Sequence, residues 1–221
     1  MLKHGEWDDP MLMLQEVFME GWYTLDGPSP PCDATMVDIG ANIGAVSLYW
    51  AAPPSSLRVQ AYEPNPSAFD TLRDNVEANG LRGRINVFPY AVGRDDGELA
   101  LWVDVPTALS TAYLDHSPAE GGRRISVPMV GMEQVWRHID QRDIWLLKID
   151  TEGAEADILE GAPAAMLKAT ANVIVEYHDN ICPGAFTRCR EVLDAAGFRC
   201  RTRVHHWDEA NPPGVIYASR A

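Results

Sequence analysis

The sequence lacks a membrane-length apolar run and lacks cysteines at metal-binding spacing. Its four cysteines are Cys32, Cys182, Cys189 and Cys200. None of them forms the CxxC spacing of zinc and redox sites, which predicts reduced thiols in an intracellular protein. The longest uncharged stretch, 39–57, contains glycines and two prolines and does not resemble a membrane span. The first ten residues carry charges where a signal peptide would be apolar, so we expect a cytoplasmic protein.

Basic residues are also scarce. The chain has 18 Lys and Arg against 32 Asp and Glu, a formal net charge of -14. A field of this sign opposes binding to nucleic acid or to an anionic membrane, both of which need a basic face. The 221 residues, with 46% apolar and 23% charged side chains, predict one soluble globular domain over 1–221 with a sizeable core. We therefore expect neither nucleic acid nor a membrane as a partner.

What the sequence does contain is an alternation of apolar strands and helices. Strands are expected at 35–39, 58–64, 85–92, 144–150 and 171–178, and helices at 45–52, 66–80, 132–139, 154–169 and 185–197. The helix over 154–169 contains Gly161 and Pro163, which favours a break into two pieces. Such alternation predicts an α/β protein with a doubly wound, Rossmann-like sheet. Two last strands, 198–205 and 214–220, are expected to form an antiparallel pair.

Two segments depart from this rhythm. Residues 1–33 predict a helical and loop extension, with a helix from Met11 to Tyr23. Residues 97–130 predict an excursion of two strands, at 97–105 and 123–130, whose connecting loop hangs near the site. Trp102 and Tyr113 lie in or near this excursion and are candidates to border an acceptor. The adjacent His205 and His206 receive no chemical role.

The turn after the first strand, "VDIGANIG" at 37–44, excludes two common ligands. Ligands of doubly wound sheets bind at the carboxyl ends of the strands. A dinucleotide fingerprint aligned on Gly40 needs glycines where Asn42 and Ala45 stand, and a phosphate loop needs a lysine that is missing here. The remaining pattern is D-x-G-x-x-x-G. Its Asp38 would repel a diphosphate but would pair with the ammonium of a methionyl group.

A second acidic residue, Glu63 in "YEPNP", lies 23 residues after Gly40 at the end of the second strand. A carboxylate there accepts hydrogen bonds from both ribose hydroxyls of an adenosine, which fits NAD and S-adenosylmethionine alike. Together with Asp38 and the missing glycines, Glu63 favours S-adenosylmethionine. The alternative is an exposed glutamate before a proline turn. Tyr90 and Ala91 in "PYAVG" are expected to border the adenine ring.

Together, "VDIGANIG", "YEPNP", "PYAVG" and "LLKIDTEGAEADILEGA" resemble the FkbM-type family of S-adenosylmethionine-dependent methyltransferases, over about 37–178. The resemblance implies the seven-stranded, mostly parallel sheet of class I methyltransferases, with helices on both faces. It also implies O-methylation of a small molecule, a sugar or a natural-product scaffold. The expected cofactor-binding residues are Asp38, Gly40, Ala41, Asn42, Gly44, Glu63, Pro64, Tyr90 and Ala91. The regions before Met36 and over 106–122 do not match the family and are expected to govern substrate choice.

The "KIDTEG" element is expected to carry the chemistry. Lys148, Asp150 and Glu152 alternate, so they face one side if the strand continues through them. Asp150 is the first candidate to contact the methionyl end or to orient an acceptor hydroxyl. Glu152 is a candidate base or turn residue, and Lys148 is expected to pair with one of the two carboxylates. For Glu155 we expect interaction with the dipole at a helix start.

His178, in "VEYHDN", completes the expected catalytic set of Asp150, Glu152, Lys148 and His178. A histidine at the rim of a sheet can act as a general base near neutral pH, and the alternative is a loop histidine bonded to a neighbour. Asp150 with Glu176 or Asp179 would offer oxygens to magnesium, but their spacing is unconvincing and we expect no metal.

Two other functions remain open at this stage. One is an NAD-dependent oxidoreductase on a related sheet, and the other is a non-catalytic module that binds S-adenosylmethionine. Methylation of RNA is disfavoured by the net charge. The sequence does not specify the acceptor or the oligomeric state.

Overall fold

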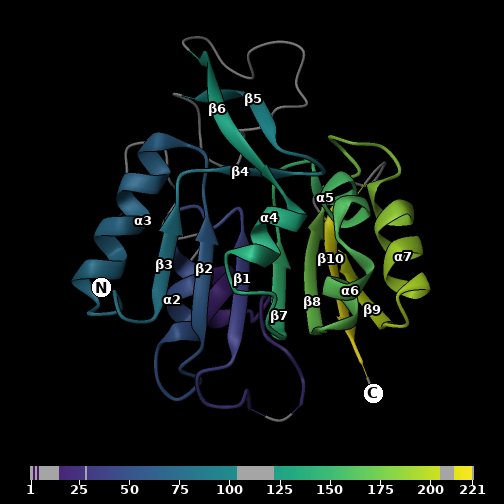
Figure 1. Cartoon of the computed structure of the whole chain (residues 1–221), viewed down its shortest axis with the longest axis horizontal. Helices are drawn as coiled ribbons and strands as arrows, with labels where there is room; N and C mark the ends of the chain where they lie inside the picture. The colour runs from purple at the N-terminus through teal and green to yellow at the C-terminus, as the bar shows by residue number, and fades with distance from the viewer. Residues whose placement is uncertain are drawn as a thin grey trace.

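A computed structural model describes residues 2, 4, 15–27, 29–103, 122–204 and 212–220. At its centre is a seven-stranded sheet in the order β3-β2-β1-β7-β8-β10-β9 (Figure 1). The strands are β1 Thr35–Ile39, β2 Arg58–Tyr62, β3 Ile85–Phe88, β7 Ile144–Ile149, β8 Thr170–Tyr177, β9 Arg199–Val204 and β10 Gly214–Ser219. Strand β10 runs antiparallel to both of its neighbours, β8 and β9. The predicted mostly parallel sheet and its antiparallel C-terminal pair are confirmed.

Helices cover both faces of this sheet. They are α2 Ala45–Ala51, α3 Pro66–Ala78, α4 Met132–Arg137, α5 Glu155–Gly161, α6 Ala164–Lys168 and α7 Ala185–Ala195. Successive residues of a strand point to opposite faces, so the sheet feeds two separate cores. Met36 and Leu146 belong to the core that contains α2 and α3 residues. Their neighbours Val37 and Leu147 belong to the core built with α4, α5, α6 and α7.

A second sheet of three strands stands above the carboxyl ends of the central strands (Figure 1). It consists of β4 Ala91–Gly93, β5 Gly97–Val103 and β6 Arg123–Gly131, in the order β4-β6-β5. The β5–β6 pair is antiparallel, as the predicted excursion requires. Residues 104–121, which include Tyr113, lie outside the described residues.

One predicted strand, 85–92, is wrong as a single element. Strand β3 ends at Phe88, and β4 begins at Ala91 and pairs in parallel with β6 of the small sheet. Pro89 lies between them and has no backbone N–H to donate to a ladder, so the chain leaves the central sheet there. The break brings Tyr90 and Ala91 to the space between the two sheets.

The N-terminal segment also differs from its prediction. Its described part is a π-helix, η1 Gln15–Met19, and the chain leaves this helix before Trp22 and Tyr23. Residues 11–14 of the expected helix lie outside the described residues, as do His205 and His206. Trp50 Nε1 donates to the Tyr23 carbonyl at 3.1 Å, and the Tyr217 hydroxyl donates to the Trp22 carbonyl at 2.8 Å. These two hydrogen bonds fix the segment against the central sheet.

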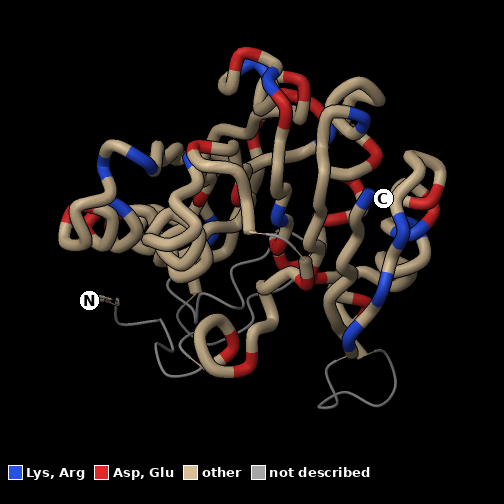
Figure 2. The backbone as a smooth tube through the Cα atoms, turned by 90° about the horizontal axis from the view of Figure 1, so that it is seen from below, with Lys and Arg blue, Asp and Glu red and all other residues tan. Residues whose placement is uncertain are grey.

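The acidic residues are distributed throughout the described part of the chain. Figure 2 shows Asp and Glu spread over the described chain rather than collected at one place. Among the described residues, no helix combines the length and the apolar character that crossing a membrane requires.

Candidate active site

The site lies between β1 and β7, where the order of the strands along the sheet changes direction. Strands β1 and β7 are parallel neighbours, with Asp38 paired to Lys148 and Ile39 to Ile149. The two loops that follow are in backbone contact. Gly40 has a φ of +73°, and a Cβ there would lie 1.7 Å from the carbonyl oxygen of Asp150. Only glycine permits this approach, so the turn and the "KIDTEG" element are held together by the fold.

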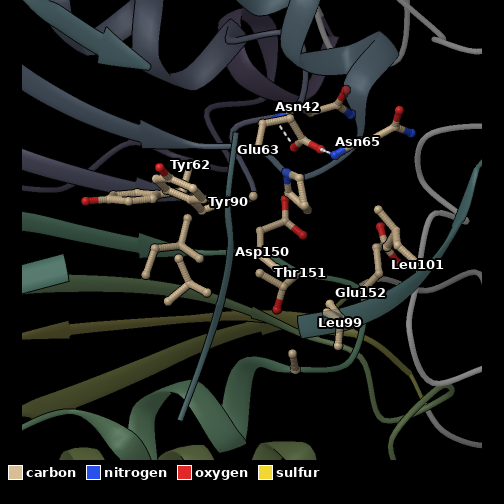
Figure 3. A pocket seen from close by; sticks show the side chains of 16 residues that line it. Asn42, Tyr62, Glu63, Asn65, Tyr90, Leu99, Leu101, Asp150, Thr151 and Glu152 are labelled. Carbon is tan, nitrogen blue, oxygen red and sulfur yellow. Dashed lines mark hydrogen bonds between the residues drawn. The ribbon is translucent and has the colours of Figure 1, made fainter. Parts of the chain in front are cut away.

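A pocket opens at this point, between the ends of the central strands and the small sheet (Figure 3). Its lining includes eight residues that the sequence predicted: Gly40, Asn42, Glu63, Pro64, Tyr90, Ala91, Asp150 and Glu152. Asn65, Leu99 and Leu101 also line it and were missed. Trp102 is not among the lining residues, because successive side chains of β5 point to opposite sides and Leu101 takes the side of the pocket.

Glu63 is the most firmly oriented carboxylate of the pocket. Its side chain is 7% exposed, and its two oxygens accept hydrogen bonds from the backbone amides of Asn42 and Asn65, each at 2.8 Å. Burial raises the pKa of Glu63 to about 7, against the lowering effect of these two amides. An ionised carboxylate has about four acceptor positions, so each oxygen can still accept one hydrogen bond from a ligand.

Aromatic rings form the wall next to Glu63. Tyr62 stacks on Phe88 with centroids 4.8 Å apart, and Phe88 stacks on His138 at 5.0 Å. The Tyr62 hydroxyl is hydrogen-bonded to His138 Nδ1 at 2.8 Å, which fixes the ring. Tyr62 and Tyr90 both line the pocket, and such faces suit a planar ligand ring.

Asp38 and Lys148 lie beneath the pocket rather than in its lining. Asp38 is fully buried, accepts a hydrogen bond from Ser47 Oγ at 2.5 Å and forms an ion pair with Lys148 Nζ at 3.2 Å. Lys148 Nζ also donates to the Gly40 carbonyl at 2.6 Å. Burial would lower the pKa of Lys148, but Asp38 and Asp150 raise it further, so the lysine stays charged. Lys148 Nζ also lies 3.5 Å from Asp150 Oδ2, so its expected pairing with one of the two carboxylates is confirmed. Asp38 joins β1 to β7 through Lys148, and its expected contact with the methionyl group stays a prediction.

Ala41 and Gly44 shape the turn without lining the pocket. The Ala41 amide donates to the Tyr62 carbonyl at 3.0 Å. Gly44 has a φ of +91°, and a Cβ there would lie 2.5 Å from Leu72 Cδ1. Both residues fix the path of the glycine turn against β2 and α3.

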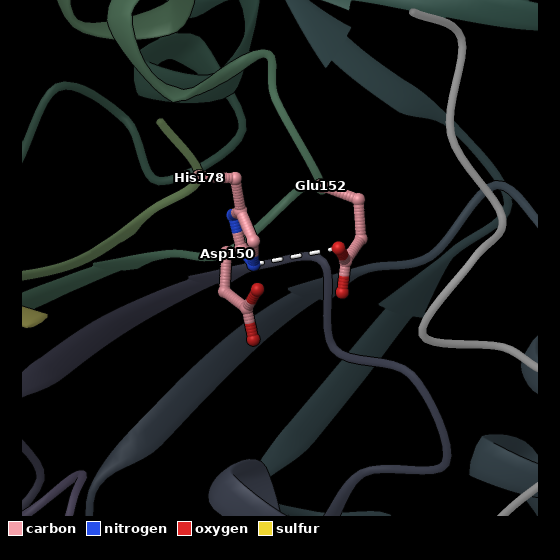
Figure 4. Close-up of side chains that lie close together, drawn as sticks. All are labelled: Asp150, Glu152 and His178. Carbon is pink, nitrogen blue, oxygen red and sulfur yellow. Dashed lines mark ion pairs between the residues drawn. The ribbon is translucent and has the colours of Figure 1, made fainter. Parts of the chain in front are cut away.

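Glu152 and His178 come together from two strand ends (Figure 4). Strand β7 ends at Ile149 and Glu152 has a φ of +55°, so the expected alternation through Glu152 is wrong. His178 Nε2 lies 3.4 Å from Glu152 Oε2, and its Nδ1 lies 3.0 Å from Glu155 Oε1. Glu155, the first residue of α5, also accepts hydrogen bonds from the amides of Thr151 and Gly153 at 3.0 and 2.9 Å. It thus orders the loop and orients the histidine.

The electrostatics of this group decide what each member can do. Burial lowers the pKa of His178, but Glu152 and Glu155 outweigh it and hold the pKa well above 6.5. Both ring nitrogens face a carboxylate, which favours the alternative of a histidine bonded to its neighbours. Burial raises the pKa of Glu152, and it raises the pKa of Asp150 to about 6 although Lys148 lowers it. Asp150 is therefore ionised at neutral pH and still able to accept a proton.

The same three side chains are close enough to surround a metal ion. Ligand atoms of Asp150, Glu152 and His178 all lie within 4.8 Å of one another. Both ring nitrogens of His178 are already paired, with Glu152 and with Glu155, so we do not propose these three side chains as ligands. The partners considered from the sequence are engaged elsewhere: Asp179 accepts a hydrogen bond from the Phe186 amide at 2.9 Å, and Glu176 is hydrogen-bonded to Tyr23.

The sheet order, the glycine turn after β1 and the carboxylate after β2 together define a class I methyltransferase. The profile of the methyltransferase FkbM domain matches residues 38–200. The chain therefore belongs to the FkbM family of methyltransferases, as the sequence motifs indicated.

Relatives of known name support this assignment. Methyltransferase 1 of Beauveria bassiana is 26% identical over 210 residues, covering 87% of this chain and 82% of that protein. The 31-O-demethyl-FK506 methyltransferase FkbM of Streptomyces tacrolimicus is 23% identical over 222 residues, covering 88% and 84%. The hexuronic acid methyltransferase AglP of Haloferax volcanii is 24% identical over 156 residues, covering 71% and 61%.

A solved structure shows the same fold. The crystal structure of a methyltransferase FkbM from Methylobacillus flagellatus KT superimposes with a TM-score of 0.60 at 18% identity. The similarity covers 88% of this chain but only 46% of that one.

Proposed function

We propose that this protein transfers the methyl group of S-adenosylmethionine to a hydroxyl of a small molecule. The observation that carries the proposal is a single pocket that has carboxyl groups at both ends, each in a different environment. At one end Glu63 is held by two backbone amides, and at the other end Asp150 and Glu152 face the same space. An adenosine and a reacting methyl group require these two environments at the two ends of one ligand.

The cofactor would lie across the carboxyl ends of β1 and β2. The free acceptor positions of Glu63 suit the two ribose hydroxyls, and the partly exposed ring of Tyr90 suits the adenine. The left-handed turn at Gly40 and Asn42 lets the methionyl part approach the backbone closely. The ionised carboxylate of Asp150 favours the positive sulfonium, whereas burial raises the pKa of Glu152 to about 8.

Asp150 would take the proton of the acceptor. Bound S-adenosylmethionine would supply the methyl group to the acceptor oxygen and would leave as S-adenosylhomocysteine, with the electron pair of the broken carbon–sulfur bond on sulfur. The hydroxyl proton passes to the Asp150 carboxylate as the new carbon–oxygen bond forms. A pKa of about 6 leaves this carboxylate ionised at pH 7, as the step requires.

The acceptor class follows from the other wall of the pocket. Leu99 and Leu101 of β5 line it, which favours an acceptor with an apolar surface near its hydroxyl, such as a natural-product scaffold. A sugar is the second candidate. The names of two relatives specify 31-O-demethyl-FK506 and a hexuronic acid as substrates, so both classes belong in a screen.

Calorimetry tests the cofactor directly. We expect the wild-type protein to bind S-adenosylmethionine and S-adenosylhomocysteine and not NADH. Binding of NADH without binding of S-adenosylhomocysteine would instead support the oxidoreductase. A screen of hydroxylated acceptors for release of S-adenosylhomocysteine then separates an enzyme from a module that only binds the cofactor.

A further inference from the structure

Tyr23 reaches the candidate active site from outside the residues that match the family. The family match begins at residue 38, whereas Tyr23 follows the π-helix η1. Its hydroxyl lies 3.1 Å from Asp150 Oδ2 and is also hydrogen-bonded to Glu176 Oε2. The tyrosine is 5% exposed, and its backbone carbonyl is held by Trp50. The hydroxyl therefore connects two carboxyl groups from different strands, β7 and β8.

The number of available hydrogens decides which group donates in each of these two hydrogen bonds. A tyrosine hydroxyl carries one hydrogen and can donate to only one carboxylate at a time. Hydrogen bonds to both Asp150 and Glu176 therefore require a second proton on one of the two acids. With Asp150 protonated, Asp150 donates to the Tyr23 oxygen and Tyr23 donates to Glu176. With Glu176 protonated, both hydrogen bonds reverse.

Charged groups on several sides of Asp150 act on the pKa of its carboxyl group. Burial and the Glu176 charge raise the pKa of Asp150, whereas Lys148 Nζ, at 3.5 Å, and His178 lower it. Glu155 is a further nearby carboxylate that raises it, and Glu152 lies on the other side of His178. Glu176 is partly exposed and so has access to solvent. A proton on Asp150 thus has a route outward.

We propose that Tyr23 relays the acceptor's proton from Asp150 to Glu176. The inference rests on the proposed methyl transfer. After attack, Asp150 carries the proton taken from the acceptor hydroxyl. In the resting protein Asp150 is ionised, so the second proton is on Glu176, which first releases it to water. Asp150 then passes the acceptor's proton to the Tyr23 oxygen while Tyr23 gives its own hydrogen to Glu176. Asp150 is ionised again, Tyr23 remains neutral and Glu176 is protonated, as before the turnover.

The variant Tyr23→Phe tests the relay because it keeps the ring and removes only the hydroxyl. We expect turnover to fall roughly 10- to 100-fold, within the range for proton-transfer groups, while affinity for S-adenosylhomocysteine stays within about two-fold. The matched control is Tyr49→Phe, which removes a tyrosine hydroxyl from α2 at a position that does not line the pocket. It should keep wild-type turnover. Full turnover in Tyr23→Phe, or an equal loss in both variants, would overturn the relay.

A second readout does not depend on any acceptor. Carboxyl ¹³C resonances of Asp150 and Glu176 can be followed against pH in both proteins. In the wild type we expect each protonation to shift both resonances, because the hydrogen bonds reverse together across Tyr23. In Tyr23→Phe each resonance should follow mainly its own protonation. Independent titrations in the wild type would overturn the relay even if methylation were found, and linked titrations would support it even if no acceptor were methylated.

Discussion

The two ends of the pocket hold their carboxylates in different ways. At the proposed ribose-binding end, here called the ribose end, the backbone amides of Asn42 and Asn65 fix Glu63 through short loops after β1 and β2. At the proposed methyl-transfer end, here called the transfer end, side chains from distant segments hold Asp150: the Tyr23 hydroxyl at 3.1 Å and the Lys148 ammonium at 3.5 Å. The first arrangement follows from the path of the backbone. The second is a network of charges that exists only after the chain has folded.

This difference predicts different responses to substitution. Backbone amides remain when side chains are replaced. Binding at the ribose end should therefore be weakened mainly by substitutions that distort the glycine turn or remove the Glu63 carboxylate. The transfer end contains buried charges that compensate one another, so removing one leaves another unpaired. Damage there should affect stability and turnover more than cofactor affinity.

The largest effect is expected where the two ends meet, at Gly40. In Gly40→Ala the new Cβ would overlap the Asp150 carbonyl, 1.7 Å away, in a backbone conformation with φ +73°. We expect a loss of about 3–5 kcal/mol in the free energy of unfolding, from overlap and left-handed strain together. Urea denaturation measures it.

The matched control is Gly80→Ala. Gly80 has a similar φ of +69°, but nothing lies within 4 Å of a Cβ there. It should lose only about 1–2 kcal/mol, the strain alone. Equal losses in the two variants would show that the contact between the two loops carries no special constraint.

Lys148→Met should have the next largest effect. The substitution leaves the fully buried Asp38 without its cation, and we expect a loss of about 3 kcal/mol in the free energy of unfolding. Adding Asp38→Asn should restore part of the loss, because the unpaired charge is then gone. Lys168→Met, at an exposed position of α6, should change stability by less than about 0.5 kcal/mol. A similarly small change in Lys148→Met would contradict the account of the transfer end.

The smallest effect is a pH dependence at the ribose end. The ionised carboxylate of Glu63 accepts hydrogen bonds from ribose hydroxyls better than the protonated acid does. Cofactor affinity should therefore fall as the pH drops through about 7, by at most about ten-fold per pH unit. Stability of the free protein has the opposite sign. Folding raises the pKa of Glu63, so protonation of this side chain stabilises the folded protein at pH values below the pKa of the unfolded chain. This stabilisation is lost as the pH rises through about 7. Charges facing Glu63 include Lys148, which lowers its pKa, and Asp38, which raises it.

Calorimetric affinities for S-adenosylhomocysteine between pH 6 and 8 measure this effect. In Glu63→Gln the affinity should be weaker and nearly constant over the same range. A wild-type affinity that does not change with pH would show that Glu63 keeps one charge state in both free and bound protein.

The two ends of the pocket also differ in how well the sequence predicts them. Local signals were sufficient for the ribose end, because Gly40, Asn42 and Glu63 lie in short motifs directly after strands. The same holds for most of the strands, which are continuous apolar runs. Tyr23 was missed because its contact with Asp150 spans 127 residues and no motif marks it. Asp38 was assigned to the methionyl ammonium because sequence spacing does not show that Lys148 already neutralises its buried charge.

The most direct test of the two-ended pocket is a crossed pair of variants. Glu63→Ala should weaken binding of S-adenosylhomocysteine by about 10- to 100-fold, since it removes hydrogen bonds to a charged group, and should keep most turnover at saturating cofactor. Asp150→Asn should keep affinity within about three-fold and lower turnover by roughly 10²- to 10³-fold. If both variants lost affinity and turnover in the same proportion, the division of the pocket into a binding end and a transfer end would be wrong.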